Sequence, residues 1–571
     1  MHQSIFEWLQ ILSFLLLASV LAFVIGGIWS SLVHGRSTVL HPFLEWLENS
    51  IYRYSGINPQ EEMGWTAYAK NLVVFNLCGG ILLFILLLLQ GYLPLNPQSF
   101  SGVPFIQAFN ITVSFMTNTN WQSYAGESTL SYASQMLGLT TQNFLSAATG
   151  SAVLMALIRG ITRATTKSIG NFWADMVRSV VYLLLPLSVI LALFLTGQGV
   201  VQTLSSYETV ETLEKAQQVI PLGPVASQVA IKQIGTNGGG FFNASSAHPF
   251  ENPTVLSNLF QMVFLLAIPA GMVYGYGLLI GSKRHAFLIL GVMFGIWAAG
   301  FAIALFSESR INPVTDAYPL WEGKEVRIGN TNSVLWAITT TATSNGSINM
   351  MLESLTPLAG GVTLFNMMIG EVSFGGIGVG LSRIIMYILL TVFLCGLMVG
   401  RTPEYKGKKL DKRDIQWIVL AILTPSVLIL IGAGISSILP TALSSLSSRG
   451  PHGLTELLYA FTSSAANNGS AFAGLDANTN YYNIVLAVVM VLGRLGIIIP
   501  SLAIAGSFAS KKIIPHTAGT LSTNSILFGI LLFFAIVILG SLAFLPALSL
   551  GPIVEQLLMM HGQTVPVSGE I

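Results

Sequence analysis

The chain has 571 residues, of which 53% are hydrophobic and only 9% are charged, whereas about 25% of the residues in an average soluble domain are charged. So much apolar surface excludes an ordinary soluble protein, and a net charge of +1 gives no basis for nucleic-acid binding. We therefore expect an integral protein of the lipid bilayer. Its two cysteines, Cys78 and Cys395, lie in apolar stretches and predict neither a disulfide framework nor a metal site.

The hydrophobic stretches predict an all-α polytopic membrane protein with ten transmembrane helices. A helix needs about 20 mainly apolar residues to cross roughly 30 Å of hydrocarbon. Ten stretches meet this requirement: 8–29, 69–92, 136–158, 177–198, 257–281, 286–306, 364–399, 415–438, 483–509 and 526–548. The first is interpreted as a retained span, because Met1–Leu9 lacks the basic residues of a signal peptide. The seventh is too long and too rich in glycine for one plain helix.

Four shorter stretches, 103–116, 224–235, 331–343 and 453–466, are too short and too polar to cross the bilayer. We expect re-entrant half-helices there, which are tolerated at membrane depth where they are buried in protein or line an aqueous cavity. The order is then one span, four pseudo-repeated units of helix, pore loop and helix around a central pore, and one final span. The predicted segments are 1–64 (first helix and linker), 65–160, 161–282, 283–400 and 401–512 (pore units 1 to 4), and 513–571 (last helix and tail).

The positions of Lys and Arg predict the orientation. The linkers between units hold 14 of the 25 basic residues, namely Arg159, Arg163, Lys167, Arg178, Lys283, Arg284, Arg401, Lys406, Lys408, Lys409, Lys412, Arg413, Lys511 and Lys512. Cytoplasmic loops carry such an excess, so we expect these linkers in the cytoplasm. The re-entrant loops and, with ten spans, both termini then face outside.

Each re-entrant stretch is followed by a variant of one short sequence motif, which we call a phrase. The four variants are Thr117-Asn118-Thr119-Asn120, Thr236-Asn237-Gly238-Gly239, Ser344-Asn345-Gly346-Ser347 and Asn467-Asn468-Gly469-Ser470. Their second residues are 119, 108 and 123 positions apart. A single Asn-Gly is a common turn signal, and ordinary turns between helices are the alternative interpretation. Four phrases at nearly regular spacing favour an internally repeated membrane fold.

These loops suit the coordination of a monovalent cation by backbone carbonyl groups. Carbonyl oxygens replace the hydration shell of K⁺ without adding net charge, so that the ion can still leave. Gly and Asn adopt the required backbone angles at least cost, and each half-helix directs the negative end of its dipole towards its loop. Hydroxyls of Thr117, Thr236 and Ser344 either add ligands or support the loops. Thr119 stands where the other loops have Gly, so we expect different angles in the first loop and only approximate fourfold symmetry.

Three charged residues, Glu371, Arg383 and Arg494, fall within the membrane-spanning units. Such charges are costly and by default indicate function. Glu371 opens a segment with further glycines, which predicts a broken helix beneath the loops. We hypothesise a gate there, with Arg494 under the loops opposing leakage of K⁺ and paired with Glu371; the alternative is a purely structural ion pair. Arg383 is expected to extend towards the membrane surface. Residues 248–253 predict a surface turn that could also shape the entrance to the loops.

The loops and the ten-span layout resemble the potassium-binding A subunits of bacterial Kdp potassium-transporting P-type ATPases, over essentially the whole chain. The motifs that carry the resemblance are Asn118-Thr119-Asn120-Trp121, Gly235–Phe241, Thr343–Ser347 and Asn467–Phe472. That family shares its four-unit pore with Trk, Ktr and HKT potassium transporters. The resemblance implies that the loops bind K⁺ as the transported substrate on the outer side of the bacterial cytoplasmic membrane. It also implies partners: a catalytic B subunit that hydrolyses ATP, a single-span C subunit and often a small F peptide.

The sequence itself supports this division of labour. It contains no Asp-Lys-Thr-Gly phosphorylation motif and no Gly-x-x-x-x-Gly-Lys-Ser/Thr phosphate loop, so we expect no organic cofactor here and a non-catalytic role in which a partner uses ATP. A stand-alone channel or symporter of the Trk/Ktr type is the alternative within transport. A membrane-embedded enzyme is disfavoured, because no His-Glu-x-x-His motif is present.

Overall fold

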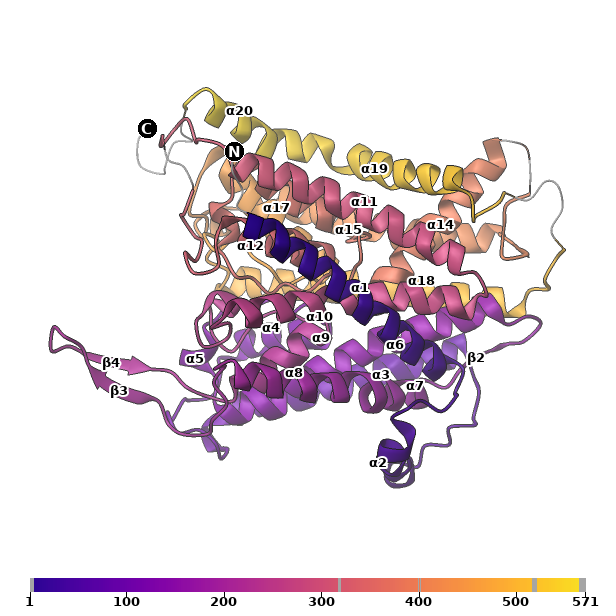
Figure 1. Ribbon diagram of the computed structural model, residues 1–571, viewed down its shortest axis with the longest axis horizontal. Coiled ribbons are helices and arrows are strands. Elements are labelled where there is room, and N and C mark those ends of the chain that lie inside the picture. Colours follow the sequence, from indigo (N-terminus) through magenta and orange to yellow (C-terminus); the bar gives the residue numbers. More distant parts are fainter. Residues whose placement is uncertain (1–4, 317–319, 399, 401, 516–520, 564–571) are drawn as a thin grey trace.

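The computed structural model describes residues 5–316, 320–398, 400, 402–515 and 521–563 (Figure 1). Arg401, one of the basic residues expected in a cytoplasmic linker, lies outside the described residues, as does the end of the tail. Most long helices run lengthwise through the molecule. Within these described residues, ten helical segments are long and apolar enough to cross a membrane, in agreement with the ten predicted spans.

The ten spans follow the predicted order. They are formed by α1 (Ile5–Val33), α3 (Trp65–Leu89), α6 (Thr141–Thr162), α7 and α8 (Phe172–Ser179 and Leu185–Gly197), α10 (Val255–Leu279), α11 (Lys283–Glu308), α14 (Val379–Met398), α15 (Lys412–Ser436), α18 (Asn480–Ser510) and α19 (Ile526–Leu548) with α20 (Val554–Met560). A π-helical segment, Ser134–Thr140, precedes α6, and single π-helical turns join α7 to α8 and α19 to α20.

The four short helices that the sequence predicts are also present. They are α4 (Phe105–Met116), α9 (Val225–Ile234), α12 (Asn330–Ala342) and α17 (Gly450–Ala466). Their lengths of 12, 10, 13 and 17 residues are below the span length, because each ends at one of the Asn-containing phrases. We call them the pore helices.

The second span of each unit lies towards the inside of the bundle. In α6, α10 and α14 the buried share of the most apolar window is 89%, 83% and 67%, and in α18 it is 56%. The share is only 22% in α3 and α15, the first spans of units 1 and 4. An apolar helix with a largely exposed surface is suited to lipid, so α3 and α15 form part of the lipid-facing layer.

The flanking helix α1 packs closely along α10. A Cβ added to Gly26 would lie 2.4 Å from the carbonyl oxygen of Gly271. Gly271 and Gly275 are four residues apart on α10, and this small-residue spacing lets two helices approach closely in a membrane.

The seventh predicted span is broken, as its glycine content predicts. Helix α13 (Pro357–Met368) ends at Met368 and α14 begins at Val379, with residues 369–378 non-helical between them. Gly370, Glu371, Gly375 and Gly378 have positive φ angles in this segment. We call residues 369–378 the broken segment.

The remaining elements are short. They include α2 (His41–Ser55), α5 (Gly126–Thr129), α16 (Pro440–Leu443) and the 3₁₀ turns Gln90–Tyr92, Ser245–Ala247 and Leu352–Ser354. Three antiparallel pairs join β1 (Met63–Gly64) to β2 (Ser168–Gly170), β3 (Glu208–Glu211) to β4 (Gln217–Ile220), and β5 (Glu404–Tyr405) to β6 (Lys408–Lys409). The hairpin β3–β4, which the sequence analysis did not predict, projects from one end of the bundle, while α2 and β2 lie at the other end (Figure 1).

Candidate ion-binding ring

The four loops that follow the pore helices form a closed cycle of contacts. We call residues 117–120, 236–239, 344–347 and 467–470 the loop ring. A glycine of one loop faces a carbonyl oxygen of the next: a Cβ added to Gly238, Gly346 or Gly469 would lie 2.0 Å from the oxygen of Asn345, 2.2 Å from that of Asn468 or 1.9 Å from that of Thr119. The first loop completes the cycle, because Asn118 Nδ2 donates to the carbonyl oxygen of Thr236 at 2.9 Å. Only glycine fits at such close approaches.

Backbone hydrogen bonds show that the first loop is offset by one residue from the sequence alignment. The amides of Asn237, Asn345 and Asn468 each donate to the carbonyl five positions earlier. In the first loop Thr119 makes this bond, to Ser114 at 2.9 Å. Thr119 therefore corresponds to these three asparagines, and Asn120 takes the glycine position. The prediction that Thr119 replaces glycine was wrong, because Asn118 and Asn120 are both plausible anchors in the sequence.

With this register, all four loops share left-handed φ angles at two equivalent positions. These are Asn118 (64°) and Asn120 (54°), Thr236 (45°) and Gly238 (109°), Ser344 (55°) and Gly346 (71°), and Asn467 (60°) and Gly469 (98°). The second loop has a third such residue, Gly239 (65°). The ring is therefore closer to fourfold symmetry than Thr119 suggested. A β-branched residue rarely adopts positive φ, and such strain persists only where the surroundings impose it. At Thr236, the amide of Ile377 in the broken segment donates to the hydroxyl at 2.8 Å.

Two asparagine side chains of the ring bond to the pore helix of a neighbouring unit. Asn345 Nδ2 donates to the carbonyl oxygen of Lys232 at 2.9 Å, and Asn468 Nδ2 donates to that of Thr340 at 3.1 Å. In each case the acceptor belongs to the pore helix of the preceding unit. Asn237 Nδ2 donates instead to Asn118 Oδ1 at 2.6 Å. These buried amides fix the loops relative to one another.

The three hydroxyls proposed as ligands or supports all make supporting contacts. Thr117 is the residue after α4, just before the left-handed Asn118, and its Oγ1 donates to the carbonyl oxygen of Val113 at 2.8 Å. Ser344 Oγ donates to the carbonyl oxygen of Asn467 in the fourth loop at 3.1 Å. Together with the hydroxyl of Thr236, described above, each of these hydroxyls forms a hydrogen bond with a backbone group.

On one side of the ring lies a cavity of about 870 Å³, which we call the mouth cavity. Asn120, Gly239, Gly346 and Gly469, one residue from each loop, line it. The first and fourth loops contribute much of the wall through residues 120–125 and 469–478. All four loops are thus accessible from one shared cavity.

The broken segment packs against the ring as a floor. The amide of Gly375 donates to the carbonyl oxygen of Ala342, at the end of α12, at 2.8 Å. A Cβ on Gly376 would lie 3.1 Å from the Cβ of Ser344, so a larger residue would press on the third loop. The glycines of this segment therefore allow it to lie directly against the loops, as the sequence predicts.

Glu371 in this floor pairs with Arg383 and not with Arg494. Arg383 Nη1 lies 3.1 Å from Glu371 Oε2, and both side chains are buried. Arg383 Nη2 also donates to the carbonyl oxygen of Ala466 at the end of α17, and Glu371 Oε1 accepts from Asn468 Nδ2 at 2.8 Å. The expectation that Arg383 extends to the membrane surface was wrong, because its carboxylate and carbonyl partners lie inside the bundle.

Arg494 projects from α18 towards the inner helix α6. It is 8% exposed, and its Nη2 donates to the carbonyl oxygen of Ser146 at 3.1 Å. A Cβ added to Gly150 would lie 3.4 Å from the same nitrogen. The proposed pairing of Arg494 with Glu371 is therefore not observed. The hydrogen-bond partner of the guanidinium is a neutral carbonyl, so no carboxylate contact among the described residues balances its positive charge.

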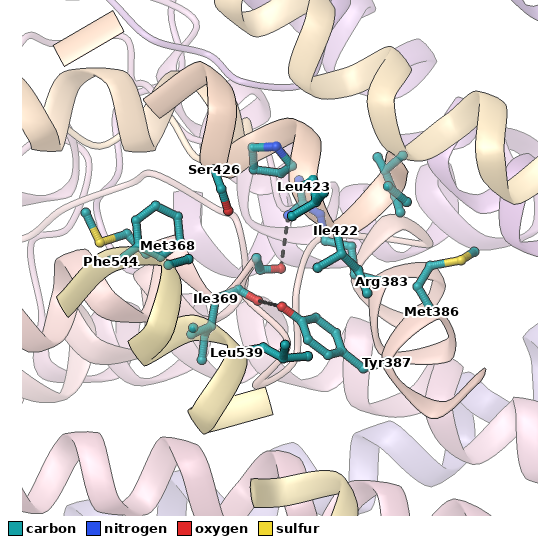
Figure 2. A pocket seen from close by; sticks show the side chains of 16 residues that line it. Met368, Ile369, Arg383, Met386, Tyr387, Ile422, Leu423, Ser426, Leu539 and Phe544 are labelled. Carbon is teal, nitrogen blue, oxygen red and sulfur yellow. Dashed lines mark hydrogen bonds between the residues drawn. The ribbon is translucent and has the colours of Figure 1, made fainter. Parts of the chain in front are cut away.

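A small cavity of about 70 Å³ lies beside the floor (Figure 2). Gly370, Arg383 and Tyr387 line it together with residues of α15 and α19 such as Ser426 and Phe544. Tyr387 donates to the carbonyl oxygen of Ile369 at 3.4 Å, as Figure 2 shows. The cavity is mainly apolar, and of the charged pair only Arg383 lines it.

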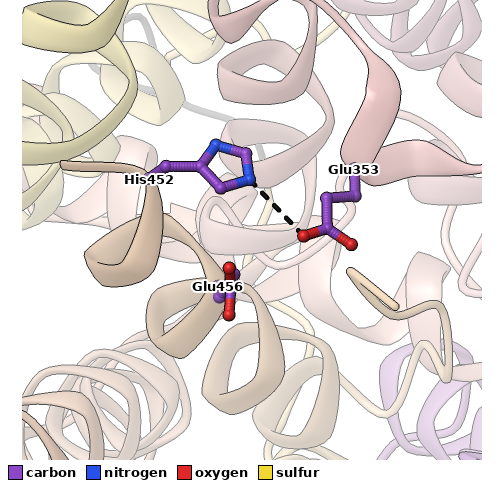
Figure 3. Close-up of side chains that lie close together, drawn as sticks. All are labelled: Glu353, His452 and Glu456. Carbon is purple, nitrogen blue, oxygen red and sulfur yellow. Dashed lines mark ion pairs between the residues drawn. The ribbon is translucent and has the colours of Figure 1, made fainter. Parts of the chain in front are cut away.

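Near the wall of the mouth cavity, His452 lies between the carboxylates of Glu353, which Figure 3 shows, and Glu555. Its Nδ1 is 2.8 Å from Glu555 of α20 and its Nε2 is 3.5 Å from Glu353. Burial alone would lower the pKa of His452, but the hydrogen bonds to Glu353 and Glu555 raise it to about 10. Glu456 is close enough to complete a possible metal-ligand set. The high pKa favours a protonated imidazole in an ion-pair cluster, which joins the C-terminal helix to a pore helix.

One buried pair beside the ring was missed by the sequence analysis. Lys232 of α9 and Glu251 form an ion pair in which both side chains are 0% exposed. Glu251 belongs to the segment 248–253, which was predicted as a surface turn. The sequence indicates such a pair through the single lysine in the short helix 224–235, because a lysine in a buried helix requires an acidic partner.

Comparison with known proteins identifies the family. A sequence profile described as KdpA, potassium-transporting ATPase A subunit, matches residues 12–557. The chain belongs to this family. The family resemblance drawn from the loop motifs is thereby confirmed.

Individual relatives agree. A "Potassium-transporting ATPase potassium-binding subunit" from Leptospira interrogans is 51% identical over 561 residues, covering 98% of this chain and 99% of the relative. A protein of the same description from Pseudomonas fluorescens is 51% identical over 560 residues, covering 97% and 99%. Among solved structures, the potassium transporter TrkH from Vibrio parahaemolyticus aligns with a TM-score of 0.49 and 15% identity, covering 86% of this chain and 97% of TrkH.

Proposed function

We propose that the loop ring binds K⁺ through backbone carbonyl groups and that this KdpA-family chain is the potassium-binding subunit of an ATP-driven uptake pump. The proposed binding residues are Thr117, Asn118, Thr119, Asn120, Thr236, Asn237, Gly238, Ser344, Asn345, Gly346, Asn467, Asn468 and Gly469. The observation that carries the proposal is the closed cycle in which glycines of three loops meet carbonyl oxygens of the next loop.

The chemistry of the ring favours a monovalent cation. Its residues are uncharged, so binding rests on dipoles and need not become too tight for release. The pore helices end at the ring and direct the negative ends of their dipoles towards it. Several amide nitrogens and hydroxyls of the ring are engaged in contacts with other loops or pore helices. The amide oxygens of Asn120, Asn237 and Asn467 have no hydrogen-bond partner among the described residues, so they are available as ligands besides the backbone oxygens.

The proposal includes an orientation and a set of partners. The mouth cavity faces outside, both termini lie outside, and the basic linkers face the cytoplasm of a bacterial cell. The chain divides into four pore units, 65–160, 161–282, 283–400 and 401–512, between the flanking segments 1–64 and 513–571. A catalytic B subunit hydrolyses ATP, and a single-span C subunit and often a small F peptide complete the complex. K⁺ is the transported substrate of this chain.

The floor beneath the ring acts as a barrier in this proposal. Arg494 presents a positive charge on the far side of the ring from the mouth cavity and opposes free passage of K⁺. Glu371 fixes the position of the fourth loop through Asn468. The small cavity beside Gly370 and Arg383 is a candidate start for the onward route towards the ATPase subunit.

The test is the K⁺-stimulated ATPase activity of the copurified complex with Gly238→Asp. A carboxylate at this close approach would displace the third loop and add charge to the ring. We expect the half-saturating K⁺ concentration to rise at least about tenfold, which corresponds to roughly 1.4 kcal/mol, with weaker discrimination against Na⁺. An assembled variant that keeps its K⁺ affinity and its cation preference would show that the ring is not the binding site.

A further inference from the structure

The pore helices carry four equivalent side chains that face the backbone of their own loops. These residues are Ser114, Lys232, Thr340 and Ser463. They are equivalent because the carbonyl oxygen of each accepts the loop hydrogen bond from the amide five positions later, as described above. Ser114 Oγ donates to the carbonyl oxygen of Trp121 at 2.9 Å, and Thr340 Oγ1 donates to that of Ser347 at 2.7 Å. Ser463 Oγ accepts from the amide of Gly469 at 3.0 Å. Three units therefore use a neutral hydroxyl.

The second unit uses a charged group at the same place. Lys232 Nζ donates to the carbonyl oxygen of Gly239 at 3.1 Å and to Ser245 Oγ at 3.2 Å. Ser245 Oγ donates to the same carbonyl at 2.9 Å. The carbonyl oxygen of Gly239 is thus engaged by an ammonium and a hydroxyl, and hydrogen bonds from charged donors are about twice as strong as neutral ones.

The charge of Lys232 is balanced by Glu251. The ammonium pairs with Glu251 Oε2, while Oε1 of the same carboxylate accepts from the amide of Phe242 at 3.0 Å. Burial of an ion pair is costly, so it needs further hydrogen bonds of this kind to be tolerated. The pair also reaches the neighbouring unit, because the carbonyl oxygen of Lys232 accepts from Asn345 Nδ2 at 2.9 Å.

We propose that Lys232 and Glu251 are positioning residues for ion discrimination: they fix the second loop more rigidly than the hydroxyls fix the other three. The inference rests on the proposed function of the ring. A carbonyl ring distinguishes K⁺ from ions of other size only as far as its oxygens resist displacement. The second loop is then the most rigid of the four. The carbonyl oxygen of Lys232 also holds the third loop in place through its hydrogen bond with Asn345.

The deciding variant is the double substitution Lys232→Thr with Glu251→Gln in the purified complex. The new threonine supplies the kind of hydroxyl that Thr340 has at the equivalent position of the third unit. Both charges are removed together, so that no unpaired buried charge remains. We expect the half-saturating K⁺ concentration for ATPase stimulation to rise about fivefold or more and the preference for K⁺ over Rb⁺ and Na⁺ to narrow. The maximal rate at saturating K⁺ stays within about twofold, because the ATPase machinery is untouched.

A matched control removes another buried ion pair at the opposite end of the bundle. Arg159→Met with Asp175→Asn deletes the pair between α6 and α7, whose closest atoms are 2.6 Å apart. This control is expected to lower thermal stability without changing cation preference. If the Lys232 double variant does not assemble, Ser245→Ala removes the shared hydroxyl, keeps both charges and is expected to change the preference in the same direction by a smaller factor.

The outcomes separate the inference from the proposed function. If Gly238→Asp alters cation preference while the Lys232 double variant, or Ser245→Ala in its place, keeps wild-type affinity and preference, the ring is the binding site and the positioning role is wrong. If Gly238→Asp also changes nothing, the ring itself is wrongly assigned. A loss of preference in the Lys232 variant equal to that in the Arg159 control would also overturn the positioning role, since it would reflect general destabilisation.

Discussion

The loop ring and the broken segment beneath it lie against each other but are built from different groups. The ring holds its shape through amides, hydroxyls and glycine contacts, and none of its own residues is charged. The floor contains Glu371, paired with Arg383, and both Ile377 of the floor and the guanidinium of Arg494 lie beside Gly150 of α6. A site that must release its ion benefits from dipoles, whereas a barrier benefits from a full charge. Under the proposed function, selection and blocking of the ion are assigned to separate layers.

The strongest test of the neutral ring is Gly346→Ala. Gly346 has φ 71°, and its added Cβ would lie 2.2 Å from the carbonyl oxygen of Asn468, so either the third or the fourth loop must move. We expect the apparent K⁺ affinity in ATPase assays to fall by about 100-fold, equivalent to roughly 3 kcal/mol. Gly295→Ala on α11 is the control, because its Cβ would meet no atom within 4 Å. Equal affinity in both variants would contradict the tight ring.

The charged floor is tested by Glu371→Gln. This change leaves Arg383 buried without its carboxylate and removes an anionic acceptor from Asn468, so we expect a loss of about 3–5 kcal/mol of stability. Thermal unfolding of the detergent-solubilised complex measures the effect. The double variant Glu371→Gln with Arg383→Met should recover most of the stability, and a double variant no better than the single one would show that the pair is not the cause.

The barrier role is tested by Arg494→Ala. Removal of the guanidinium should increase ATP-independent K⁺ leak through the complex in proteoliposomes, by a factor of several, while coupled transport weakens. Arg494→Lys keeps a positive charge and should retain most of the barrier. Unchanged leak and unchanged coupled transport in Arg494→Ala would leave only a structural role for this residue.

The smallest expected effect concerns the ion-pair cluster on the mouth side. Because the pKa of His452 is raised to about 10 from an ordinary value near 6.5, its pairing with Glu353 and Glu555 contributes fully below pH 6.5 and is lost as pH rises through 10. Melting temperature should therefore fall by a few degrees between pH 7 and pH 10 in the wild type. His452→Gln should lower it at pH 7 and flatten this part of the pH profile; an unchanged profile would show that another group is responsible.

Sequence reasoning succeeded where one physical property dominates. The ten spans follow from hydropathy, the pore helices from their shortness, and the broken segment from its glycines. The offset of the first loop could not be predicted, because Asn118 and Asn120 both match the asparagine of the other loops and only backbone hydrogen bonding distinguishes them. The partner of Glu371 depends on how α14 and α18 rotate in the bundle, and periodicity does not determine that rotation. The buried pair of Lys232 and Glu251 was predictable in part, because a lysine in an otherwise uncharged pore helix requires a partner.

The contacts between loops have a consequence for how the ring can evolve. Asn345 and Asn468 each bond to the pore helix of the preceding unit, and Ser344 bonds to the carbonyl oxygen of Asn467. A substitution in one loop therefore changes the structural environment of the neighbouring loop. The effects of two substitutions in adjacent loops on K⁺ affinity should then not be additive. If the ring selects the ion as proposed, its ion preference is a property of the whole cycle and not of any single repeat.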